Sequence, residues 1–74
     1  MRYLCRVDDR QLHAYAQTRR DFLLASDDTL WAHESHDYLV AAVSGTVIAH
    51  RIGNVFYDAQ TEAPLYYEAA EPPA

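Results

Sequence analysis

The sequence is short of cysteine, glycine and proline, and it contains no lysine. Its one cysteine, Cys5, cannot form a disulfide within the chain, and small domains without disulfides usually work in reducing compartments. The longest weakly polar run, Tyr38 to Ala49, is too short for a membrane-spanning helix, which needs about 20 residues. The N-terminus has no apolar segment typical of a signal peptide. We therefore expect a cytoplasmic protein that does not associate with membranes.

Residues suited to catalysis or metal binding are also scarce. His33 and His36 lie beside carboxylates, but a zinc site needs at least three ligands, and this spacing at a strand end directs the two rings to opposite faces. Cys5 is expected on the core side of a strand, where a thiol behaves as a small hydrophobic group. We therefore expect no enzyme activity, no catalytic residue, no metal and no cofactor, with a metal at His33 and His36 as the alternative for that segment.

The length of 74 residues and the hydrophobic content of 50% predict one small folded domain. A chain of this size buries only about 60% of the surface that its unfolded form exposes, so its stability should be marginal. We place the domain at residues 1–68 and expect a flexible C-terminal tail at residues 69–74, which contain two of the three prolines.

The first third of the sequence predicts a strand followed by a helix. Residues 2–7 alternate as a strand does. The segment Asp8-Asp9-Arg10-Gln11 resembles a capping box at a helix N-terminus. Apolar residues then recur at helical spacing, at Leu12, Tyr15, Ala16, Phe22 and Leu23. We predict a helix that ends near residue 25, before the turn Ser26-Asp27-Asp28.

The rest of the chain reads as short strands rich in Val, Ile, Thr and aromatic residues. They are predicted at residues 29–35, 38–43, 46–52, 55–57 and 65–68. Ser44-Gly45 and Gly53-Asn54 are typical of tight hairpin turns, and His36-Asp37 separates two further strands. We see no internal repeat. The order β-α-β-β-β, with one more short strand, predicts an α+β fold in which one helix packs on one face of an antiparallel sheet.

This architecture leaves one face of the sheet uncovered. A helix is about 10 Å across, whereas four strands spaced by about 4.8 Å form a sheet roughly 15–20 Å wide. The strands nevertheless supply apolar and aromatic residues to both faces, Trp31 and Tyr57 among them. An exposed apolar face usually marks a binding surface or a homodimer interface. The alternative is that these rings fill a thin core.

Negative charge is concentrated after residue 26. Residues 1–26 have a net charge of +2 and residues 27–74 a net charge of −7, which together give the −5 of the chain. An acidic surface repels nucleic acid and favours basic partners, so we expect no direct binding to DNA or RNA. It can instead imitate a phosphate backbone on a basic protein, or simply be solvated. The candidate partner-binding residues are Asp27, Asp28, Trp31, Glu34, Asp37, Tyr57, Asp58 and Glu62.

In general character the chain resembles the small inhibitory proteins of phages and mobile elements, among them the anti-CRISPR proteins. The features behind this resemblance are the short acidic chain, the β-α-β-β-β pattern from Arg2 to Tyr57 and the scarcity of catalytic residues. It rests on no motif. The resemblance implies an inhibitor or regulator in the host cytoplasm that docks on a CRISPR effector subunit, in some cases as a DNA mimic. The alternative is a small homodimeric structural or accessory protein without an inhibitory role.

Overall fold

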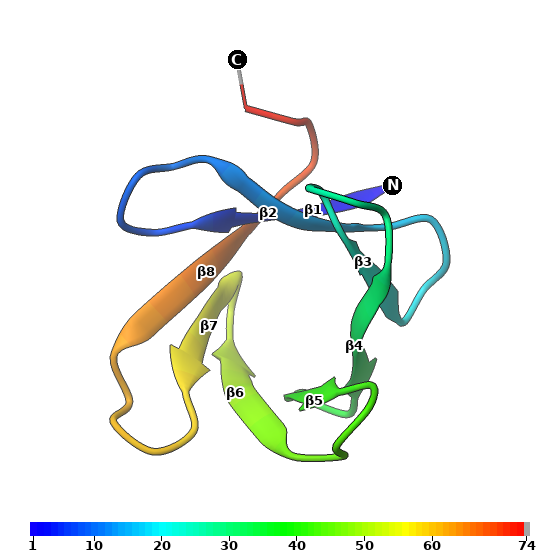
Figure 1. Cartoon of the computed structure of the whole chain (residues 1–74). Helices are drawn as coiled ribbons and strands as arrows, with labels where there is room; N and C mark the ends of the chain where they lie inside the picture. The colour runs from blue at the N-terminus through cyan, green and yellow to red at the C-terminus, as the bar shows by residue number, and fades with distance from the viewer. Residues whose placement is uncertain (74) are drawn as a thin grey trace.

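The computed structural model describes residues 1–73 and shows an all-β protein. Over this range the chain forms eight strands: β1 (Arg2–Arg6), β2 (Leu12–Ala16), β3 (Asp21–Leu24), β4 (Leu30–Ser35), β5 (Tyr38–Ala41), β6 (Val47–Ile52), β7 (Val55–Asp58) and β8 (Pro64–Ala69). Each strand pairs antiparallel with the next, and β8 pairs with β1. The sheet is therefore a closed barrel (Figure 1).

The barrel consists of four similar hairpins, β1–β2, β3–β4, β5–β6 and β7–β8. In the turn of each hairpin, one residue with positive φ donates its N–H to the carbonyl four residues earlier, at 2.8–2.9 Å. These residues are Arg10 (φ 60°), Asp28 (61°), Gly45 (74°) and Glu62 (63°). Their spacing of 17 or 18 residues defines a fourfold internal repeat, so the expectation of no repeat was wrong.

A β-bulge recurs at the same place in every hairpin. The pairing register shifts directly after the inward-facing residue of the first strand, which is Leu4, Phe22, Leu39 or Phe56. The shift leaves one unpaired residue on the second strand, which is His13, Trp31, Ile48 or Leu65. Bulges bend a strand and increase its twist, and bulges repeated around a sheet favour its closure. Four of them explain how such short strands complete a barrel.

The core alternates large and small side chains. The first strands of the hairpins contribute Leu4, Phe22, Leu39 and Phe56, all fully buried. The second strands contribute Ala14, Ala32 and Ala49, also fully buried, and Tyr66 takes the equivalent place in the last hairpin. Narrow barrels are commonly filled by such alternation, because side chains from all the strands meet at one axis.

The predicted helix is absent, and the α+β fold class was wrong. Residues 8–25 form the end of one turn, β2, a second turn and β3. Asp9 Oδ1 accepts the N–H of Gln11 at 3.0 Å, which closes a local turn instead of capping a helix. Thr18 Oγ1 accepts the N–H of Asp21 at 3.1 Å and turns the chain between β2 and β3. The same short polar side chains serve caps and turns, so the pattern admitted both readings.

The predicted uncovered sheet face was also wrong. Because the sheet closes on itself, one of its faces becomes the barrel interior, and no helix is needed to cover it. The other face is an outer wall without a second layer. The strands predicted after residue 28 are confirmed in position by β4 to β8. Of the predicted tail, Ala69 is the last residue of β8, and residue 74 lies outside the described residues.

Candidate functional site

The two ends of the barrel differ in their turns and in their charge. The long turns of the four hairpins, residues 7–11, 25–29, 42–46 and 59–63, lie at one end, and the turns between hairpins lie at the other. The long-turn end has six carboxylates, which we call the acidic rim: Asp8, Asp9, Asp27, Asp28, Asp58 and Glu62. Arg6 and Arg10 are the positive charges in these turns and at the strand ends beside them.

The acidic rim is contiguous across three turns. The N–H of Val7 donates to the carbonyl of Leu65 at 3.0 Å, which joins the first turn to the last hairpin. The N–H of Ala25 donates to the carbonyl of His13 at 3.0 Å, which joins the second turn to the first hairpin. The remaining turn, residues 42–46, has no charged residue, and its Val43 is 97% exposed.

Three rim carboxylates are fixed and held ionised by their own turns. Asp9 accepts from Arg6 Nε at 3.0 Å, and this bond lowers the pKa of Asp9. The hydroxyl of Thr29 donates to Asp27 at 2.8 Å and lowers the pKa of that carboxyl. Asp58 accepts two backbone N–H bonds from its turn, at 2.7 and 3.0 Å, which lower its pKa in the same way. The negative charge of these turns is therefore maintained without a partner.

The other rim carboxylates are available for outside contacts. Asp8 and Glu62 are exposed, and neither side chain makes a hydrogen bond or ion pair within residues 1–73. Asp28 is exposed and accepts the hydroxyl of Tyr15 at 2.6 Å. A partner's arginine or lysine can pair with these three carboxylates without breaking an ion pair in this chain.

Aromatic side chains fill the barrel interior between the core and the rim. The ring of His13 lies 4.6 Å from that of Trp31 and 4.7 Å from that of Tyr66, centroid to centroid. Trp31 is half-buried in this cluster, so it is not the exposed anchor that the sequence suggested. His13 Nε2 is buried without a hydrogen-bond partner in the described residues, and burial lowers its pKa.

The opposite end is closed by a charge network of four side chains. Glu34 accepts from Arg2 Nη1 at 2.6 Å and from Arg51 Nη1 at 3.1 Å. Glu68 bonds Arg2 through both carboxylate oxygens, at 2.7 and 2.9 Å, and lies 3.4 Å from Arg51. The side chain of Glu34 is only 11% exposed. Its role is therefore to close the barrel, and it is separate from the acidic rim.

The eight predicted partner-binding residues divide by position. Asp27, Asp28, Asp58 and Glu62 come together on the acidic rim, whereas Asp37 lies in the turn at the opposite end. Tyr57 lies on the outer wall of β7, its ring stacked on that of His50 with 5.9 Å between centroids.

Sequence reasoning missed two rim residues, Asp8 and Asp9, because they were assigned to a helix start. A shared signal was available. Asp9, Asp27, Ser44 and Thr61 stand 17 or 18 residues apart, and each accepts a backbone N–H two residues later.

The described residues contain no group of three or more His, Cys, Asp or Glu side chains placed to hold a metal ion. His33 lies on β4 opposite Asp21 and Val40, and His36 lies in the following turn with φ of 57°. No helix long and apolar enough to cross a membrane was found within residues 1–73.

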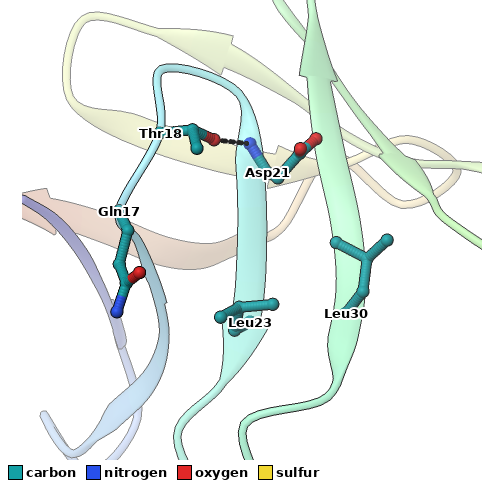
Figure 2. A pocket seen from close by; sticks show the side chains of 5 residues that line it. All are labelled: Gln17, Thr18, Asp21, Leu23 and Leu30. Atoms are coloured by element: carbon teal, nitrogen blue, oxygen red, sulfur yellow. Dashed lines mark hydrogen bonds between the residues drawn. The ribbon is translucent and has the colours of Figure 1, made fainter.

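An open groove of about 290 Å³ lies on the outer wall beside the turn at residues 17–20 (Figure 2). Leu23 and Leu30 come from neighbouring strands and supply its apolar part, and Asp21 is its one titratable residue. The groove can accept an apolar side chain, but it offers no pair of groups for acid–base chemistry.

Comparison with protein-family models, with curated proteins and with solved structures gave no match.

Proposed function

We propose that the protein is a non-enzymatic binding module whose acidic rim docks on a basic surface of another protein, as an inhibitor or regulator. The observation that carries this proposal is the position of the rim, which gathers six of the chain's eleven carboxylates at one end of the barrel. A field of one sign at one end steers a partner of opposite charge toward that end and sets its orientation.

The scaffold suits such a role because its turns are ordered before binding. Asp9, Asp27 and Asp58 are held by hydrogen bonds within their turns. Groups that are already fixed lose less conformational entropy on binding, so more of the contact energy contributes to affinity. Asp8, Asp28 and Glu62 would then provide the direct ion pairs.

The proposed partner is a protein whose basic surface ordinarily contacts phosphates. Carboxylates spaced around a rigid rim can occupy such a surface in place of nucleic acid, whereas nucleic acid itself would be repelled by the rim. The resemblance to anti-CRISPR proteins is not carried further, because the β-α-β-β-β pattern that supported it is replaced by an all-β barrel.

Two matched triple variants test the proposal. The rim variant D8N/D28N/E62Q removes three exposed carboxylates from the long-turn end, and the control D21N/D37N/E71Q removes three exposed carboxylates that lie away from it. Both change the net charge from −5 to −2. The tagged chains are used to capture proteins from a nuclease-treated extract of the source cells, and bound proteins are eluted with duplex DNA.

We expect the wild type and the control to retain the same DNA-displaceable proteins and the rim variant to lose them. Retention of the same proteins by the rim variant would show that the rim is not the docking surface. Capture of no DNA-displaceable protein by any of the chains would count against the proposed class of partner. The unfolding transition of each variant, which should match the wild type, shows that the fold is intact.

A further inference from the structure

The hairpin β5–β6 differs from the other three in its charge. Residues 38–52 contain no carboxylate, and their one charged side chain, Arg51, points into the network at the barrel end. The outer wall here is apolar and accessible: Val43 is 97% exposed, Ile52 63%, Tyr38 51% and Val47 42%. We call Tyr38, Val40, Val43, Val47 and Ile52 the apolar face.

The apolar face is continuous across the strands. Leu39 and Ala49 are fully buried, so their neighbours in β5 and β6 point outward. Val40 pairs with Val47 across the hairpin, and Tyr38 pairs with the uncharged His50. The surface continues onto β4 through Leu30, which is 51% exposed and lies in the groove of Figure 2.

We infer that the apolar face binds the same face of a second copy of this chain. The charge distribution supports this occupant. Each chain has a net charge of −5, so most approaches between two copies oppose carboxylates to carboxylates. In the order of strands around the barrel, β5–β6 is the hairpin most distant from β1–β2 and its two rim aspartates. Two copies that meet at this hairpin bury apolar side chains and keep their rims apart.

The size and closure of the barrel are consistent with this contact. A standard interface buries roughly 800 Å² on each partner, which is about one sixth of the 4858 Å² surface of the chain. One hairpin in four can supply an area of that order. Because the barrel is closed, no strand edge is free for pairing, so the copies must associate by side-chain packing. A twofold axis through the face satisfies both copies with one surface.

The dimer is independent of the acidic rim, which lies at the long-turn end and stays exposed. It would present two rims in one particle, and two linked sites bind a repetitive basic surface more tightly than one.

Sedimentation equilibrium from micromolar to millimolar concentration tests the dimer. The variant V43E/I52E places two carboxylates on exposed positions of the face, and the control Q11E/Q60E adds the same two charges on exposed turn residues outside it. The wild type and the control should dimerise, and V43E/I52E should dimerise at least about tenfold more weakly, because charges at the centre of an interface are strongly unfavourable. Thermal unfolding checks that each variant is folded.

A wild type that stays monomeric throughout, or a V43E/I52E variant that dimerises as the control does, would overturn the inference. Binding to an octa-arginine peptide separates this result from the proposed function. V43E/I52E should bind the peptide at its rim as well as the wild type does, so a failure of the dimer would leave the rim proposal unaffected.

Discussion

Arg2 Nη1 lies 2.6 Å from Glu34 Oε1, and this contact joins the first strand to the fourth across one end of the barrel. Arg51 and Glu68 complete a ring in which each carboxylate contacts both arginines. The four charges cancel within the ring. This end of the barrel is therefore close to neutral, and the excess negative charge of the molecule lies mainly at the acidic rim.

Replacing Glu34 with alanine should destabilise the fold. The substitution leaves Arg2 and Arg51 facing each other with only Glu68 to compensate them. Breaking a fully buried pair costs about 3–5 kcal/mol, and partial exposure reduces this to about 2 kcal/mol. Urea unfolding measures the change, with the exposed Glu71→Gln as control. Equal stability of Glu34→Ala and the wild type would show that the network does not support the barrel.

Lowering the pH should reduce stability through His13. Burial, and secondarily the charge of Arg6, lower the pKa of His13 in the folded chain. The unfolded chain takes up this proton near pH 6.5, so the contribution is complete above about pH 6.5 and declines as the pH falls below it. His13→Phe should therefore reduce the loss of stability between about pH 7 and pH 5. The control His36→Asn, in an exposed turn, should keep the wild-type profile, and an unchanged profile for His13→Phe would refute the assignment.

The equivalent turn positions should respond oppositely to glycine and alanine. Gly45→Ala should cost about 1 kcal/mol, because a residue with a Cβ is disfavoured at positive φ. A Cβ there would meet nothing within 4 Å, so the cost arises in the backbone alone. Arg10→Gly should stabilise by about 0.5 kcal/mol, since it relieves φ of 60° at the same position of another hairpin. Thermal unfolding that shows both changes with the same sign would contradict the equivalence of the turns.

The alanine layer should not tolerate larger side chains. Ala49 is fully buried and faces the barrel axis with Ala14 and Ala32. Ala49→Leu should cost about 1–3 kcal/mol by overpacking. The matched change Ala59→Leu, in an exposed turn, should leave the unfolding midpoint nearly unchanged. If the two variants were equally stable, the barrel would have more interior space than the structure shows.

The sequence predicts most strands but not the fold class, and the reason lies in residues 8–25. Leu12, Tyr15 and Ala16 fit a helical period, yet the first two lie in β2 with only Ala14 and Ala16 fully buried. The bulge at His13 interrupts the alternation that would have marked a strand. The hairpins with glycine turns, at Gly45 and Gly53, were recognisable, because glycine is the residue that positive φ favours.

The repeat and part of the candidate site were harder to predict because equivalent positions conserve geometry more than residue type. The positive φ at Gly45 recurs at Arg10, Asp28 and Glu62, none of which is a glycine. Projecting the turn at Gly45 back by 17 residues would have placed a turn at Asp28. That step would have replaced the helix with a hairpin and brought Asp8 and Asp9 to the rim.

The rim is tested most directly by the salt dependence of binding to an octa-arginine peptide, followed by fluorescence anisotropy. Ion pairs at exposed charges weaken as salt screens them, so the affinity of the wild type should fall steeply as salt increases. D8N/D28N/E62Q should bind more weakly and with a shallower salt dependence, while D21N/D37N/E71Q should match the wild type. Equal affinity and equal salt dependence for both variants would contradict the assignment of the rim as the binding surface.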